Sequence, residues 1–153
     1  MSKLITENDL NGIFDAILPF DDRKAWVAFQ KGGYTANNTA SKVTGVTLSS
    51  GANATSYFTI GTDQVTVKQS GFYKISLSFC LSAITTESNC KRIALYKNGS
   101  ENCVAIGRKP SWENCTNIAV TTLAKDDVLT MYARAEDGNS TFTASMILIE
   151  YLG

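Results

Sequence analysis

Histidine, the most common general acid–base and a common metal ligand, is absent from the 153 residues of this chain. No Ser–His or Cys–His catalytic arrangement can therefore form, nor can a zinc site that needs histidine. The acidic pairs Asp21–Asp22 and Asp126–Asp127 are adjacent in sequence, so their carboxylates diverge in an extended chain. Paired acid–base catalysis needs carboxylates that face each other across a cleft. We therefore predict a protein that is not an enzyme and has no catalytic residue or cofactor.

The remaining candidate ligands are aspartates and cysteines. Four aspartates in predicted loops could hold calcium through oxygen atoms, but no Asp-x-Asp-x-Asp loop organises them: Asp63, Asp126, Asp127 and Asp137. The cysteines are even in number and allow three disulfide pairings: Cys80, Cys90, Cys103 and Cys115. Without a C-x-x-C pair they do not indicate zinc or thioredoxin-like chemistry, and buried thiols are the alternative to disulfides. We expect no metal site.

The net charge and the aromatic residues indicate which classes of partner the protein could bind. Lys plus Arg and Asp plus Glu number 14 each, so electrostatics does not favour nucleic acid or an anionic membrane. No apolar run approaches the ~18 residues of a membrane span, and residues 1–9 lack the apolar core of a signal peptide. Exposed aromatics among Asn, Ser and Thr suit sugar or protein contacts. The candidate ligand-loop residues are Tyr34, Arg108, Lys109 and Trp112.

The clearest structural pattern lies in residues 71–81, where apolar side chains recur at every second position. A period of two places alternate residues on opposite faces of a strand. One face is predicted to carry Tyr73, Ile75, Leu77, Phe79 and Leu81, and the other Phe72, Lys74, Ser76, Ser78 and Cys80. We therefore predict a central strand with one apolar face.

Further strands are predicted on both sides of it. Asn98-Gly99 between residues 92–97 and 102–107 indicates a two-residue hairpin. Strands are also expected at 24–30, 43–48, 57–60, 116–123, 128–135 and 141–151. Turn signals this regular predict an all-β fold, a ten-stranded jelly-roll sandwich of two sheets. The length is that of a single domain.

A short helix is expected before the sandwich. Its apolar stripe has the i, i+3, i+4, i+7 spacing of one helical face and ends at Pro19: Leu10, Ile13, Phe14, Ile17 and Leu18. A helix this short is marginal alone in water, so the stripe must dock. It could pack on its own domain, or residues 1–22 could form an attachment and trimerisation segment joined to a head domain of residues 23–153. We favour the second arrangement.

The last strand is apolar on both faces. By simple alternation Phe142, Ala144, Met146 and Leu148 share one face, and Ile147, Ile149 and Tyr151 the other. A strand covered on both sides needs a second layer, which in a homo-oligomer is a neighbouring copy. We therefore predict a trimer interface that contains Phe72, Ile147, Ile149 and Tyr151.

Six landmarks in order resemble the tumour-necrosis-factor-like jelly roll, in particular the globular heads of the first complement component. They are AWVAF at 25–29, Asn53 with Tyr57 and Phe58, VTVKQSGFYKI at 65–75, LYKNG at 95–99, LAKDDVLTM at 123–131 and STFTASMILI at 140–149. The resemblance implies a homotrimer whose inner sheet packs around a threefold axis, and a disulfide between Cys90 and Cys115. Asp126 and Ala144 stand where the family usually has glycine, so no ligand or calcium site is carried over.

The predicted helix stands where this family often has a collagen-like stalk. A trimeric head on a short apolar peg is similar to the surface proteins of bacteriophage heads, collars and fibres. The expected function is a virion surface protein, bound through its helix to other virion proteins and presenting loops to a host-surface glycan or protein. The alternatives are a purely structural decoration protein and a secreted complement-like or cytokine-like ligand.

Overall fold

A computed structural model describes residues 25–81, 90–107, 114–136 and 140–153. The predicted helix and its apolar stripe, the loop residues Arg108, Lys109 and Trp112, and Asp137 lie outside these ranges. Within the described ranges, no helix is long and apolar enough to span a membrane.

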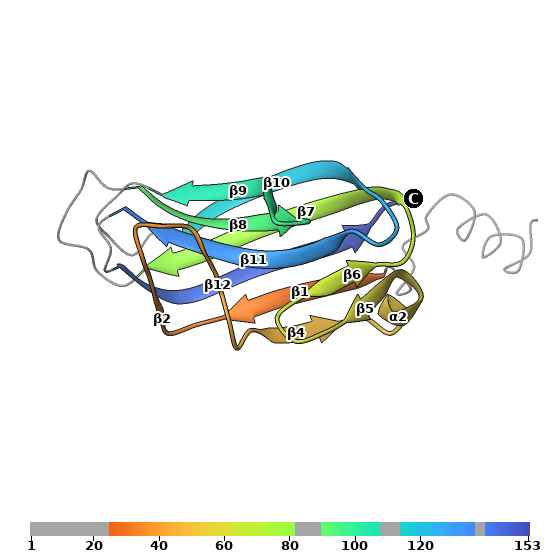
Figure 1. Ribbon diagram of the computed structural model, residues 1–153, viewed down its shortest axis with the longest axis horizontal. Coiled ribbons are helices and arrows are strands. Elements are labelled where there is room, and N and C mark those ends of the chain that lie inside the picture. The colour runs from red at the N-terminus through yellow and green to blue at the C-terminus, as the bar shows by residue number, and fades with distance from the viewer. Residues whose placement is uncertain (1–24, 82–89, 108–113, 137–139) are drawn as a thin grey trace, which may run out of the picture.

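Two six-stranded antiparallel sheets pack face to face (Figure 1). The first sheet has the order β10-β7-β12-β1-β4, with β2 beside one end of β12. Its strands are β1 (Trp26–Lys31), β2 (Tyr34–Ala36), β4 (Thr47–Ser50), β7 (Gly71–Leu81), β10 (Asn114–Leu123) and β12 (Ser140–Tyr151). The central strand predicted at 71–81 is therefore β7, between β10 and β12.

The second sheet has the order β5-β6-β11-β8-β9, with β3 beside β11. Its strands are β3 (Ser41–Lys42), β5 (Phe58–Ile60), β6 (Val65–Val67), β8 (Lys91–Lys97), β9 (Ser100–Gly107) and β11 (Val128–Ala135), and a one-turn helix, α2 (Ala54–Tyr57), precedes β5. The described residues thus form a jelly-roll sandwich with twelve strands. The strands that no predicted range covers are the short β2, β3 and β6.

The core lies between the sheets and follows the predicted alternation in β7. Tyr73, Ile75, Leu77, Phe79 and Leu81 are all buried, and Phe72 on the opposite face is 57% exposed. The predicted hairpin is also confirmed. Asn98 and Gly99 have φ of 52° and 82°, the positive values that a type I′ turn requires at both central positions.

The predicted assignment of residues to the two faces of the last strand was wrong. The register of β12 against β7 shifts between Phe142 and Ala144, and this β-bulge moves Phe142 onto the same face as Ile147 and Ile149. All three side chains are 0% exposed inside the sandwich. Ile147 and Ile149 therefore belong to the core of their own protomer and cannot line a trimer interface.

Tyr151 was also assigned to that interface, and its ring packs within its own protomer. The ring centroid lies 4.5 Å from that of Tyr57 and 5.2 Å from that of Tyr73. Of the four predicted interface residues, Phe72 alone has a largely exposed side chain. The outward residues of β12 are instead Ala144, Met146, Leu148 and Glu150, which alternate with the buried ones.

Both ends of the described chain lie at one end of the sandwich. The Tyr151 amide donates to the Ala25 carbonyl, and the Phe72 amide donates to the Gly153 carbonyl. We call this the proximal end; Figure 1 shows the C-terminus there. β1 and β7 both run from it to the distal end, where Lys31 and Leu81 lie. At about 3.3 Å per residue, the eleven residues of β7 separate the two ends by roughly 35 Å.

Candidate functional site

The outer face of the first sheet, turned away from the core, carries very few charged side chains. The strand register determines which residues share this face. They are Phe72, Lys74, Ser76, Ser78 and Cys80 of β7, Thr116, Ile118, Val120 and Thr122 of β10, Ala144, Met146, Leu148 and Glu150 of β12, Trp26, Ala28 and Gln30 of β1, and Thr47 and Ser49 of β4. Only Lys74 and Glu150 among these are charged, and their Nζ and Oε2 atoms lie 2.8 Å apart. The contact is an ion pair without the geometry of a hydrogen bond.

The outer face of the second sheet has a different character. It carries Lys42, Arg92, Glu101 and Arg134 around a stacked pair of tyrosines, Tyr96 and Tyr132, whose ring centroids are 3.8 Å apart. Arg92 pairs with Glu101 at 3.3 Å, and Arg134 with Glu136 at 3.8 Å. This mixture of charges is what a solvated face carries. The two outer faces therefore differ in how many charged side chains they carry.

Three large apolar side chains are exposed together on the first sheet. Phe72, Ile118 and Val120 are 57%, 65% and 62% exposed. Val120 is opposite Lys74, and Thr122 opposite Phe72, in the β7–β10 register, so the three belong to adjacent rows at the proximal end. We call them the apolar corner. Exposed apolar groups that gather in this way mark contact surfaces.

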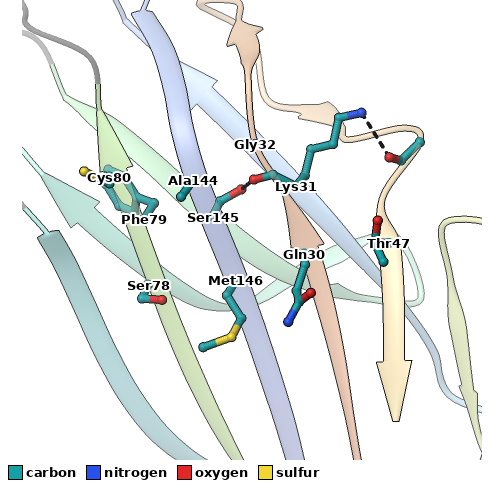
Figure 2. Close-up of a pocket in the computed structure, with 11 residues that line it drawn as sticks. Gln30, Lys31, Gly32, Thr47, Ser78, Phe79, Cys80, Ala144, Ser145 and Met146 are labelled. Carbon is teal, nitrogen blue, oxygen red and sulfur yellow. Dashed lines mark hydrogen bonds between the residues drawn. The ribbon is translucent and has the colours of Figure 1, made fainter.

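A pocket of about 600 Å³ lies at the opposite corner of this face (Figure 2). We call it the distal pocket. Its lining comes from β7, β12, β1, β4 and the residues between β3 and β4: Gln30, Lys31, Gly32, Gly45, Thr47, Ser78, Phe79, Cys80, Ala144, Ser145 and Met146. The lining mixes hydroxyl and amide groups with apolar atoms, and Lys31 is its one charged side chain.

The bulge in β12 and two glycines shape this pocket. A Cβ at Gly32 would lie 2.7 Å from the Thr143 carbonyl oxygen, so only glycine lets β1 leave the sheet beside the bulge. Gly45 has a φ of 64°, a conformation that favours glycine. The sequence analysis did not find this pocket, and the adjacent glycines at the end of β1 were the available signal.

Lys31 is held in position at the pocket rim. Its Nζ donates to the Gly45 carbonyl at 3.0 Å, and Figure 2 shows the side chain reaching to that oxygen. On the other side of the loop, the Val46 amide donates to Asp63 Oδ1 at 2.8 Å. Hydrogen bonds from the Gly45 and Val46 amides hold the pKa of Asp63 below its ordinary value, and Lys42 and Lys31 add smaller attractions. Hydrogen bonds from Lys31 and to Asp63 therefore hold the loop between β3 and β4 on both sides.

Tyr34, which was predicted to be a ligand-loop residue, packs against the hydrophobic core. It lies in β2, and its ring stacks on Phe142 with 5.0 Å between centroids. Burial raises the pKa of Tyr34 to about 12. Its hydroxyl lies 3.2 Å from Ser145 Oγ, which donates to the Lys31 carbonyl at 2.7 Å. Tyr34 therefore supports the wall of the distal pocket through Ser145.

The cysteines and aspartates form no chemical centre in the described chain. None of the four cysteines is in a disulfide, so the bridge implied between Cys90 and Cys115 is not formed in this structure. Burial raises the pKa of Cys103, which makes its thiol less reactive. No group of three His, Cys, Asp or Glu residues that could hold a metal occurs among the described residues.

Asp127, one of the aspartates considered for calcium, is a structural residue. It is 8% exposed, accepts a hydrogen bond from Asn98 Nδ2 at 2.7 Å, and accepts another from the Ala124 amide at 2.8 Å. These contacts tie the β8–β9 hairpin to the turn before β11. Its carboxylate therefore joins two turns.

Comparison with known proteins identifies the fold. No protein-family model matches the sequence, and no curated protein matches it. Among solved structures, the vertex protein P5 of phage PRD1 is similar with a TM-score of 0.63 at 14% identity, over 84% of this chain and 97% of that one. Murine APRIL is similar with a TM-score of 0.60 at 13% identity, over 84% and 99%.

The globular domain of zebrafish complement 1qA is also similar, with a TM-score of 0.54 at 20% identity, over 84% of this chain and 96% of that one. These proteins span a phage vertex, a tumour-necrosis-factor-family ligand and complement. Identities this low concern the fold, which does not by itself determine function. The chain therefore has the tumour-necrosis-factor-like jelly-roll fold, as the resemblance of its sequence landmarks implied.

Proposed function

We propose that this protein is a non-enzymatic, homotrimeric component of a virion surface, attached through residues 1–22 and presenting its distal end to the host. The observation that carries the proposal is the nearly uncharged outer face of the first sheet, with its apolar corner. The similarity to a phage vertex protein supports the setting. The assembled particle would place the protein outside the cell after synthesis in the host cytoplasm.

Self-association explains the contrast between the two outer faces. Covering Phe72, Ile118 and Val120, each more than half exposed, contributes roughly 1–2 kcal/mol per side chain. The only charges to be covered on this face already neutralise each other, so their desolvation is partly offset. A contact from the β10 edge of one copy to the β1–β12 half of the next is heterologous, and a heterologous contact repeated by a threefold rotation closes into a ring of three copies.

The ends of the chain give the assembly a direction. Ala25, which follows the proposed attachment segment, is hydrogen-bonded to Tyr151 at the proximal end. A particle bound through residues 1–22 would therefore hold the head by that end. The distal end, with the pocket, would point outward as adsorption requires.

The test of the trimer compares two exposed isoleucines on different sheets. Ile118→Asp should reduce the molar mass measured by light scattering from three chains to one, because it places a charge in the apolar corner. Ile106→Asp is the matched control, since Ile106 is 49% exposed on β9 of the second sheet. A wild-type protein that is monomeric at every concentration would overturn the proposal, as would equal effects of the two variants.

A secreted ligand is the second candidate, favoured by the similarity to murine APRIL and to the complement domain. Such a ligand would act without a particle and without residues 1–22. A purely structural decoration protein would share the trimer and the attachment segment but would bind nothing at its distal end. Binding of the purified head to host cells separates adsorption from decoration.

A further inference from the structure

Two arginines stand directly opposite each other on the outer face of the second sheet. The strand register pairs Arg134 of β11 with Arg92 of β8. Their neighbours Ile93 and Ala133 are buried, so the alternation of side chains turns both arginines outward. The proposed trimer covers the outer face of the first sheet, on the other side of the sandwich. The arginine pair therefore stays open to solvent in that assembly.

The pair lies at the distal end. Arg134 is followed by Ala135, whose amide donates to the Asn37 carbonyl just after β2. β2 pairs with β12 at Phe142, and Phe142 pairs with Leu81, which marks the distal end. Figure 1 shows β2 at the end opposite the C-terminus. A head attached by its proximal end would therefore present both arginines to the host.

The two nearby carboxylates approach the arginines from outside the pair. Glu101 comes from β9 and lies 3.3 Å from Arg92 Nη1, and Glu136 follows β11 and lies 3.8 Å from Arg134 Nη2. The other Glu136 oxygen accepts a hydrogen bond from the Cys90 amide at 3.0 Å. Both ion pairs are longer than charge-assisted hydrogen bonds of about 2.7–2.9 Å. Like charges directly opposite on adjacent strands are destabilising, so an anion between the two guanidinium groups would relieve their repulsion.

Arg134 is oriented to bind such an anion. Its Nε donates to the Asn38 carbonyl at 2.6 Å, which holds the guanidinium in place while its terminal N–H groups stay available. A guanidinium is a planar fork of donors that matches two oxygens of a phosphate. Two such forks carry two positive charges, and a phosphate monoester carries about −1.5 to −2 at pH 7. The pair therefore matches a phosphate monoester in both charge and donor geometry.

A hollow next to the arginines can hold the organic part of such an ester. Both arginines, Ala94, Tyr96, Glu101 and Tyr132 contribute to its lining. Ala94 is 3% exposed although it faces outward, because it lies opposite Tyr132 and two positions before Tyr96. The two tyrosine rings are stacked with 3.8 Å between centroids. Rigid rings that carry hydroxyl groups suit the mixed polar and apolar surface of a sugar.

We propose that this site binds the phosphate monoester of a phosphorylated sugar on a host-surface polymer. The phosphate oxygens accept hydrogen bonds from Arg92 and Arg134, and the sugar ring lies in the hollow beside Tyr96 and Tyr132. The biological role of the site rests on the proposed function, but the binding does not.

The probes are glucose, inorganic phosphate, and glucose esterified at its primary hydroxyl group with phosphate or with sulfate. Each is added to the full-length protein and followed by NMR and titration calorimetry. Glucose phosphate should bind with a Kd below about 10 mM, and at least about tenfold more tightly than glucose sulfate or glucose, which carry one charge or none. Inorganic phosphate should bind about threefold more weakly than glucose phosphate, because it leaves the hollow empty. The chemical-shift changes should map to β8 and β11.

Three outcomes would overturn the proposal. The first is no saturable binding of glucose phosphate below about 10 mM. The second is equal affinity for glucose phosphate and glucose sulfate, which would make the site one for sulfated polymers. The third is equal affinity for glucose phosphate and inorganic phosphate, which would reject the contact with the sugar.

Two variants and a control locate the site. Arg92→Gln and Arg134→Gln should each weaken the binding of glucose phosphate about tenfold. Arg92→Gln is the cleaner of the two, because Arg134→Gln also removes the hydrogen bond to the Asn38 carbonyl. Lys97→Gln is the matched control, since it removes one positive charge at the other end of β8. Binding that is unaffected by both arginine variants, or equally reduced by Lys97→Gln, contradicts the assignment.

Failure of this proposal can be distinguished from failure of the proposed function. Binding of glucose phosphate is measured on purified protein whatever its molar mass, whereas the trimer is tested by light scattering of Ile118→Asp. A trimer without affinity for glucose phosphate would reject the phosphate site alone. A monomer that binds glucose phosphate would reject the trimer alone.

Discussion

Two positive-φ residues, Asn98 and Asp126, occupy turns that meet at Asp127. Asn98 has a φ of 52° and Asp126 a φ of 71°. The Asn98 side chain donates to Asp127 and accepts from the Val128 amide at 2.8 Å. The Asp126 side chain is exposed. Asp126 is thus a residue in the left-handed conformation whose exposed side chain contributes little to the turn.

We predict opposite effects of glycine at these two positions. Asp126→Gly should raise the free energy of unfolding by about 0.5 kcal/mol, because glycine adopts positive φ without steric strain. Asn98→Gly should lower it by about 1–2 kcal/mol, because two hydrogen bonds are lost. Urea denaturation at equal protein concentration measures both. Changes of the same sign would mean that backbone strain is not what distinguishes the two turns.

Asp63 makes the loop that borders the distal pocket sensitive to acid. The Gly45 and Val46 amides stabilise its carboxylate form, so its pKa is lowered in the folded protein. The stabilisation is complete above the ordinary aspartate pKa of about 3.9 and is lost as the pH falls through the lowered folded-state value. Protonation therefore releases the loop only below about pH 4.

Asp63→Asn should remove this acid dependence. In the wild-type protein, the Val46 amide resonance should shift between neutral pH and pH 2, as its hydrogen bond to Asp63 weakens. In the variant that titration should be absent, while the amides of the β8–β9 hairpin behave alike in both proteins. A Val46 titration that persists in Asp63→Asn would show that another group controls the loop.

The strands show which parts of the architecture local sequence determines. β7 follows strict alternation over eleven residues, and Asn98-Gly99 forms the predicted turn, because side-chain period and turn chemistry are local properties. The bulge in β12, by contrast, is not determined by the sequence of that strand. It depends on how Thr143 meets Gly32 of β1, which no pattern within 141–151 reveals.

One extra residue in a strand exchanges its two faces, and this explains the errors at Ile147 and Ile149. Counting by twos from Phe142 put these residues outside, whereas the bulge places them inside. The distal pocket was missed for the same reason, since the bulge and Gly32 form its wall. The strands and the sheet that carries the site were therefore predictable, but the register at the site was not.

Adjacent positions in β12 test the corrected register. Ile147→Ala should lower the free energy of unfolding by about 2–4 kcal/mol, because Ile147 is 0% exposed and its truncation leaves a cavity. Leu148→Ala, on the outer face, should cost about 1 kcal/mol or less. Chemical denaturation of both variants at one protein concentration decides the matter. A larger loss at Leu148 than at Ile147 would restore the original assignment of the faces.

The molecule as a whole is polarised in two directions. Across its thickness, one outer face carries a single ion pair and the apolar corner, while the other carries ion pairs around stacked tyrosines. Along its length, both chain ends lie at the proximal end and the pocket at the distal end. In the proposed assembly, the first asymmetry provides a face for contact between copies, and the second separates the attached end from the pocket.

The head should fold and assemble without its attachment segment. Among the described residues the hydrophobic core extends from Ala25 to Ile149, and the proposal assigns residues 1–22 to attachment outside that core. We predict that the truncated protein keeps the β-sheet signal in circular dichroism, loses the signal of the predicted helix, and keeps the full-length protein's number of chains per oligomer in light scattering. It should fail to incorporate into particles when it replaces the full-length protein during assembly, because the apolar stripe from Leu10 to Leu18 is the proposed anchor.

A full-length variant separates the anchor from simple loss of chain. Replacing Ile13 and Ile17 with Asp keeps the length and interrupts the stripe, so it should abolish incorporation as the deletion does. Replacing the polar Asn8 with Ser is the control and should incorporate normally. If both the truncated and the stripe variants enter particles, the head docks through another surface. If the truncated head is instead fully active on cells in the absence of particles, the secreted-ligand alternative replaces the virion proposal.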